Sequence, residues 1–102
     1  MRKIILNASH WSNAEDFYDE LLTALQSPHW HGKSVDALID SMVFGGINAT
    51  QPPYEIRIEC MSLAPADARR EVENLQRALP IALEEYRELK GQGIQITLNV
   101  GE

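Results

Sequence analysis

The sequence has 102 residues, a common size for one domain, and we predict a single domain over residues 1–102. Hydrophobic residues make up 44% and charged residues 24%, close to the averages for globular proteins, which excludes a largely disordered chain. Fifteen acidic against nine basic side chains give a net charge of −6, and this balance argues against direct nucleic-acid binding.

Cysteine content and the N-terminus indicate the compartment. The only cysteine, Cys60, excludes an intramolecular disulfide, fits a reducing environment and is expected in the core as a small hydrophobe. Arg2 and Lys3 precede only three apolar residues, too few for a secretion signal, and no apolar run approaches the roughly 20 residues needed to cross a bilayer. We expect a cytoplasmic protein that has no membrane partner and is monomeric when free.

The first predicted elements are a strand and a helix. Lys3 to Leu6 is a short β-branched run that can start a buried strand. Ser12-Asn13-Ala14-Glu15 has the form of a capping box with Ser12 as the cap, and it predicts a helix over about residues 13–26. Asp19 and Glu20 are expected to face water, whereas spacings of three and four predict an inward face made of Ala14, Phe17, Tyr18, Leu21 and Leu25.

A second helix is predicted after the loop His29-Trp30-His31-Gly32, in which Gly32 is expected to adopt a backbone conformation that other residues resist. Ser34 is the natural cap, and Asp36 and Asp40, four residues apart, are placed together on the outer side. Gly45-Gly46 should end the helix, and residues 48–53 are expected to form a surface loop. The predicted buried stripe consists of Val35, Leu38, Ile39 and Met42.

The second half of the chain predicts strand, helix, strand. Residues 54–60 alternate apolar and polar side chains, and residues 94–100 prefer the β conformation. The helix between them should start after Pro65, with a kink or break near residue 79 because of Pro80. Gly91-Gln92-Gly93 should end it, and its stripe consists of Ala68, Val72, Leu75, Leu79, Ala82, Tyr86 and Leu89. The predicted fold class is α/β, a three-stranded parallel sheet packed by about four helices in the order β-α-α-β-α-β.

The negative charge is unevenly distributed. Residues 10–44 contain six acids and one base, Lys33, so this segment holds nearly all of the excess. Such asymmetry can steer a basic partner, although an acidic helical surface also serves solubility alone. The outer face of the second helix combines the two aspartates with Ala37, Val43 and Phe44, and short carboxylates near aromatic side chains are more typical of a docking surface.

Catalytic chemistry is the weaker interpretation. His29 and His31 with Asp36 or Asp40 could form a metal or acid–base site, but no well-specified third ligand accompanies the two histidines. The sequence has no phosphate-binding glycine motif, serine nucleophile elbow or cysteine–histidine pair. We therefore predict no catalytic residue, metal or cofactor. An enzyme would require a turnover that is lost on changing His29, His31 or Asp36.

Two segments resemble one known family. Residues 30–40, WHGKSVDALID, resemble the aromatic-glycine loop and the LDALWD helix of the barstar family, and residues 86–98 resemble its last helix and strand, as does the predicted element order. The resemblance implies an inhibitor of guanyl-type ribonucleases that lays its second helix and the preceding loop across the enzyme's active site. It implies that Asp40 is the central acid, Asp36 a second acid, Trp30 a contact aromatic and Glu88 a further acid.

We accordingly predict an inhibitor of a small, basic, extracellular-type ribonuclease or toxin domain. The residues predicted to bind the partner are Trp30, His31, Ser34, Val35, Asp36, Ala37, Asp40, Phe44 and Glu88. The chain departs from the family pattern where Ile39 replaces a tryptophan, Ser34 an asparagine and Gln92 an acid, and where residues 43–46 differ and precede a longer loop. These departures leave open an interaction module or immunity protein (antitoxin) of the same fold whose partner is not a ribonuclease.

Overall fold

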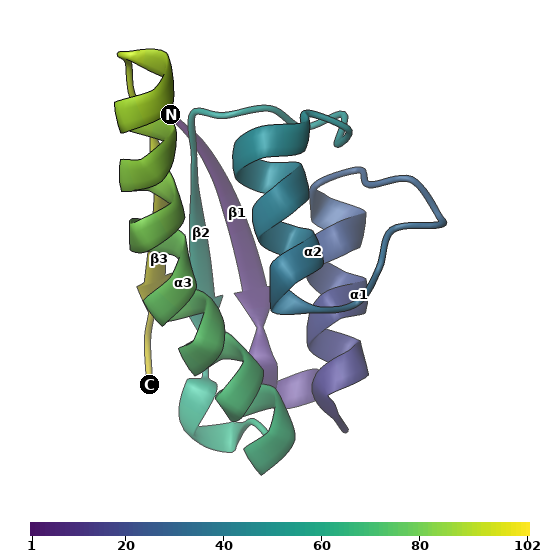
Figure 1. Cartoon of the computed structure of the whole chain (residues 1–102). Helices are drawn as coiled ribbons and strands as arrows, with labels where there is room; N and C mark the ends of the chain where they lie inside the picture. Colours follow the sequence, from purple (N-terminus) through teal and green to yellow (C-terminus); the bar gives the residue numbers. More distant parts are fainter.

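A computed structural model describes all of residues 1–102 as a three-stranded sheet covered by three helices (Figure 1). The strands are β1 (Arg2–Asn7), β2 (Tyr54–Glu59) and β3 (Ile96–Val100). The helices are α1 (Ala14–Ala24), α2 (Val35–Ile39) and α3 (Ala66–Lys90), and α2 continues into a π-helical segment, η2 (Asp40–Gly45). Single 3₁₀ turns, η1 (Ala8–His10) and η3 (Met61–Leu63), follow β1 and β2. None of the helices combines the length and apolar composition needed to span a membrane.

The sheet is entirely parallel, as predicted, with the order β1-β2-β3. Because the chain crosses the sheet in one direction and such crossovers are right-handed, all connecting helices are expected on the same face. The burial pattern agrees: Ile4 and Leu6 of β1 are buried, whereas the intervening Ile5 and the neighbouring Lys3 are exposed. The sheet therefore has one face packed under helices and one face open to solvent.

A cluster of 23 buried side chains fills the space between the sheet and the helices. Tyr54 and Ile56 contribute from the central strand, Phe17 from α1 and Leu75 from α3, and each is fully buried. Burying side chains of this size stabilises the fold by about 1.5–3 kcal/mol each. The Tyr54 hydroxyl has no hydrogen-bond partner in this core, and burial raises the pKa of Tyr54.

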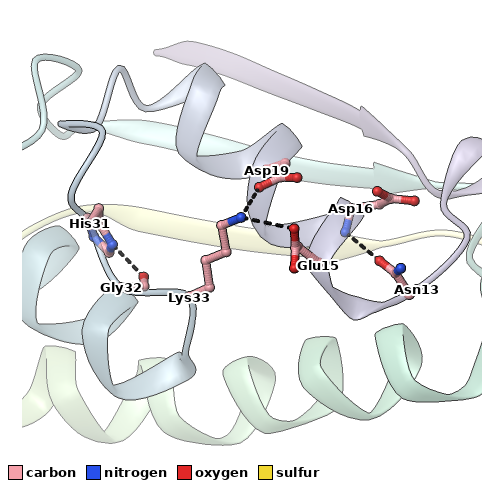
Figure 2. A network of polar contacts seen from close by, with 7 residues as sticks. All are labelled: Asn13, Glu15, Asp16, Asp19, His31, Gly32 and Lys33. Atoms are coloured by element: carbon pink, nitrogen blue, oxygen red, sulfur yellow. Dashed lines mark hydrogen bonds and ion pairs between the residues drawn. The ribbon is translucent and has the colours of Figure 1, made fainter.

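Helix α1 begins one residue later than predicted, at Ala14. Asn13, not Ser12, is the cap, because its side-chain oxygen accepts a hydrogen bond from Asp16 N at 3.1 Å (Figure 2). The Asp16 carboxylate in turn accepts a hydrogen bond from Ser12 N at 2.6 Å. The predicted capping box is therefore replaced by a related pair of bonds, in which Asn13 caps Asp16 N and the Asp16 side chain accepts from Ser12 N, the residue before the cap.

Of the kink or break predicted near residue 79, the break is absent, since Pro80 lies inside the continuous 25-residue α3. Leu79 and Ala82 on either side are buried, and this packing keeps the segment helical despite the backbone hydrogen bond that proline removes. The sheet is therefore covered by three helices, not about four. The predicted stripe also ends early: Leu89 is 75% exposed because the last turns of α3 extend beyond the strands (Figure 1).

Two predicted environments need correction. The loop over residues 48–53 is exposed at Ala49, Gln51 and Pro53, as predicted for a surface loop, but Asn48 and Thr50 are buried because this loop pairs with the C-terminal end of α1. Thr50 Oγ1 donates a hydrogen bond to the Ala24 carbonyl at 3.2 Å, which satisfies a helix-end acceptor. Cys60 is only partly buried and has a positive φ of 61°, since it forms the turn between β2 and η3.

Candidate partner-binding surface

Two aspartates occupy the outer side of α2 and the start of η2. Ser34 caps the helix as predicted, because its hydroxyl oxygen accepts a hydrogen bond from Ala37 N at 3.1 Å. Leu38, midway between the aspartates in the sequence, is fully buried and defines the inner side. Asp36 and Asp40 are both exposed, and their four-residue separation places them about one helical turn apart, as predicted.

The carboxylates of Asp36 and Asp40 accept no hydrogen bond and form no ion pair within the chain. The other four acids of residues 10–44 each have a partner within the chain: Glu15, Asp16, Asp19 and Glu20. Glu20, predicted to face water, is partly buried and accepts hydrogen bonds from Trp11 Nε1 at 2.7 Å and from Asn7 N at 3.3 Å. The two aspartates on α2 and η2 are therefore unengaged negative charges, whereas Glu20 stabilises the fold.

The single base of the acidic segment contacts α1. Lys33 Nζ lies 2.9 Å from a carboxylate oxygen of Asp19 and 3.2 Å from one of Glu15 (Figure 2). Hydrogen bonds to Asp19 and then Glu15 raise the pKa of Lys33, so it stays charged and joins the loop to the helix. Lys33 consequently offsets charge on α1 and leaves the charge on the outer side of α2 uncompensated.

Neighbouring residues of the loop before α2, Trp30 and His31, differ sharply in their exposure to solvent. Trp30 is 66% exposed, whereas His31 is only 7% exposed. His31 Nδ1 lies 2.6 Å from the Gly32 carbonyl oxygen (Figure 2), and Nε2 lies 2.7 Å from Ser41 Oγ. The structure thus places Trp30 on the surface and His31 beneath it. Gly32 is not among the glycines with positive φ, so it does not use the backbone freedom predicted for it from the sequence.

The π-helical geometry of η2 changes which side chains point outward. Val43, predicted to be exposed, is buried at 4% exposure, while Phe44 is exposed as predicted. A π-helical turn contains more residues than an α-helical turn, so a projection at 100° per residue misplaces Val43. Gly45 permits the tight turn, because a Cβ atom there would lie 2.8 Å from the Asp40 carbonyl oxygen, and Gly46, with φ of 64°, ends the helix as predicted.

An open groove of about 650 Å³ lies next to Phe44. The rings of Phe44 and Tyr86 pack with centroids 6.0 Å apart, which joins η2 to α3 at its edge. Lys90 contributes a cation to the lining of this groove. The groove is lined by residues 42–46, 51–53 and 92–95, together with Tyr86 and Lys90.

The remaining predicted contact residues lie at different depths. Val35 and Ala37 are half-buried, and the Ser34 side chain is exposed but used as the helix cap. Of the predicted stripe, Leu38 and Met42 are buried, while Val35 and Ile39 are only partly so. Glu88 is exposed on α3, two residues beyond Tyr86.

The two histidines of the loop do not converge. His29 is exposed, while both ring nitrogens of the buried His31 contact Gly32 and Ser41. No group of three or more His, Cys, Asp and Glu side chains is arranged to hold a metal ion.

A family model described as Barstar (barnase inhibitor) matches residues 1–100. The chain belongs to the barstar family. Members of this family are inhibitors and not enzymes, and their partner is a ribonuclease, so the chain is a barnase-inhibitor-like module. A comparison with curated proteins finds no match. In barstar-family terms, the exposed Asp36 and Asp40 lie on the element that the sequence resemblance identified as the inhibitory helix.

Three features of the site were not predicted. Sequence reasoning did not identify Ser41 and Asn48 as partners of the loop, Tyr86 as the contact of Phe44, or the π-helical segment. The adjacent glycines at 45 and 46 were interpreted only as a helix stop.

Proposed function

We propose that this chain inhibits a small basic ribonuclease by covering the enzyme's active site with α2, η2 and the preceding loop. The observation that carries the proposal is the pair of exposed carboxylates, Asp36 and Asp40, which no group of the chain neutralises. Membership of the barstar family supplies the class of partner. The net charge of −6 favours association with a basic enzyme.

The physical basis is mimicry of a phosphate group. A ribonuclease has a preorganised cationic pocket for the phosphate of its substrate, and a carboxylate can enter that pocket without being cleaved. The backbone of Asp40 begins η2 and that of Asp36 lies in the first turn of α2, so both carboxylates extend from helical backbone. Inhibition should therefore compete with substrate and should not require any reaction by the inhibitor.

Aromatic side chains flank the two acids and supply apolar contact area. Trp30 is largely exposed on the loop before α2, and Phe44 is exposed at the end of η2. Aromatic anchors next to desolvated charges are typical of the residues that dominate binding energy at protein interfaces. We place Trp30 and Phe44 on either side of the acids in the proposed interface, with Glu88 of α3 at its rim.

Titration of barnase with the purified protein tests the proposal. We expect loss of ribonuclease activity with increasing inhibitor, relief of inhibition by excess substrate, and weaker binding at high salt because charge attraction is screened. The Asp40→Ala variant should lose inhibition, whereas Glu59→Ala, an exposed acid at the end of β2, should retain it. Absence of inhibition and binding with barnase and related small basic ribonucleases at low salt would refute the ribonuclease target.

A second candidate is an immunity protein for a partner that is not a ribonuclease. It is favoured by the groove beside Phe44, which forms at residues 43–46, where the sequence departs from the barstar pattern, and which contains the cation Lys90. Lys90 would suit a partner that presents a negatively charged or polar group to this groove. Capture of a non-nuclease toxin that is released by Asp40→Ala would support this candidate over the first.

A further inference from the structure

A line of buried polar groups runs beneath the proposed interface. His31 is 7% exposed, and Ser41 and Asn48 are each 3% exposed. Buried polar groups lose their hydration on folding and are stable only when their hydrogen bonds are satisfied. The positions of these three side chains are therefore held by the hydrogen bonds that they make with one another and with their neighbours.

The hydrogen bonds in this line all run in one direction. A carbonyl oxygen can only accept, so the 2.6 Å contact between His31 Nδ1 and Gly32 O places a proton on Nδ1. In the neutral imidazole Nε2 then accepts, and the Ser41 hydroxyl donates to it at 2.7 Å in preference to the Leu38 carbonyl oxygen, which lies farther away at 3.3 Å. Asn48 Nδ2 donates to Ser41 Oγ at 3.1 Å, and Asn48 Oδ1 accepts from the Ser27 hydroxyl at 2.6 Å.

This line joins four separate segments. Ser27 follows the end of α1, His31 belongs to the loop before α2, Ser41 is the second residue of η2, and Asn48 lies in the loop that packs on α1. His31 is next to the exposed Trp30, and Ser41 is next to Asp40. The His31–Ser41 hydrogen bond consequently connects the two segments that present the aromatic side chain and the acid.

We propose that His31 and Ser41 are positioning residues, which fix Trp30 relative to Asp40 through their buried hydrogen bond and touch no partner themselves. This inference rests on the proposed function, because it concerns the same surface, and it replaces the predicted role of His31 as a contact residue. An interface that is already ordered loses less conformational entropy on binding. Linked hydrogen bonds that polarise one another in a dry environment are suited to that task.

The tautomer of His31 tests the inference on the free wild-type protein. Nitrogen NMR of the imidazole side chains should show His31 with its proton on Nδ1, the form that the Gly32 carbonyl selects. The exposed His29 is the internal comparison, since no hydrogen bond fixes its tautomer. A proton on Nε2 of the neutral His31 ring would overturn the proposed hydrogen-bond direction and with it the inference.

Substitution tests the consequence for binding. His31→Leu should weaken binding to barnase roughly tenfold, mainly through faster dissociation, because Ser41 and Gly32 lose their partner. Backbone order parameters of residues 29–33 should fall in the same variant. His31→Gln retains a donor and an acceptor and should recover most of the affinity and order, and His29→Leu, the same change two residues away, should alter neither.

Two further results separate the possible failures. If wild-type protein does not bind barnase, the proposed target is wrong, and the tautomer and the order parameters still decide the inference. If His31→Leu does not fold, Ser41→Ala removes the same hydrogen bond with a smaller change in volume and should show the same loss of loop order. A Leu or Ala variant that keeps both wild-type affinity and wild-type order would overturn the positioning role.

Discussion

Asp40 lies where α2 changes into η2, and its side chain has no partner in the chain. An acid that stabilised the fold would be expected to accept hydrogen bonds, as Glu20 does from Trp11 and from the backbone of Asn7. Residues kept charged, exposed and unpaired are suited to interaction outside the molecule. In the proposed function Asp40 therefore serves binding, whereas Glu20 stabilises the fold.

Replacing Asp40 with Ala should weaken barnase binding by about 2–5 kcal/mol, because a cationic group of the enzyme would be left buried without its partner. Thermal stability should stay within about 0.5 kcal/mol of wild type, since the substitution removes no internal contact. Calorimetric titration and thermal unfolding measure the two quantities. A large loss of stability with little change in affinity would assign Asp40 a structural role.

At this scale, positions that depend on local spacing were predictable. The outward orientation of Asp36 and Asp40 follows from four-residue spacing, and the cap at Ser34 follows from local hydrogen bonding. The burial of His31 and Val43 was not predictable, because it depends on Ser41, on Asn48 and on the widened turn of η2. These are contacts between segments, and no pattern within one segment encodes them.

Between elements, the loop before α2 is attached to α1 through Lys33. The ion pairs with Asp19 and Glu15 are solvent-exposed, and such pairs contribute little to stability. Their larger effect is on the field around the molecule, since Lys33 is the only base in the acidic segment 10–44.

Replacing Lys33 with Met should leave the urea midpoint nearly unchanged and increase the association rate with barnase at low salt. The extra net negative charge strengthens attraction to a basic partner, and high salt should remove the difference by screening. Stopped-flow association at two salt concentrations measures this effect. A slower association at low salt would show instead that Lys33 acts mainly by ordering the loop.

On the open face of the sheet, Glu55 links β2 to β3. Hydrogen bonding from Asn99 and the positive charge of Arg57 hold the pKa of Glu55 below its ordinary value of 4.5. A lowered pKa in the folded state means that the carboxylate stabilises the fold above pH 4.5, and that this contribution is lost as the pH falls through the folded-state pKa.

Glu55→Gln should therefore be less stable than wild type at neutral pH, and the difference should disappear in acid. Urea unfolding at pH 7 and near pH 3 measures it, with Glu59→Gln as the control, because Glu59 lies on the same strand and has no such partner. An equal difference between wild type and Glu55→Gln at both pH values would exclude this contribution.

The type of an element was predictable where the helical spacing of apolar residues continues over several turns, as in α1 and α3. The continuity of α3 was not, because local chemistry at Pro80 favours a break and only the burial of Leu79 and Ala82 against the sheet opposes it. The exposure of Leu89 has the converse cause: its spacing fits the stripe, but the helix extends beyond the surface that the stripe covers.

For the molecule as a whole, the core between one sheet face and three helices provides the stability. Leu75→Ala should reduce the free energy of unfolding by about 2–5 kcal/mol, because Leu75 is fully buried and its removal leaves a cavity. Leu89→Ala, the same substitution in the same helix, should cost much less since Leu89 is largely exposed. Denaturant unfolding of both variants measures the two losses in free energy of unfolding. Equal losses would show that the hydrophobic core extends to Leu89.

The entirely parallel sheet also has a consequence for how the chain reaches its native state. Arg2 pairs with Tyr54 and Tyr54 with Ile96, so every strand pairing joins residues separated by a complete helical crossover. No hairpin can form first and serve as a local template, and distant parts of the chain must meet before any inter-strand bond is gained. Refolding should accordingly be slower than that of a helical bundle of equal length, with a rate limited by the search for these remote encounters.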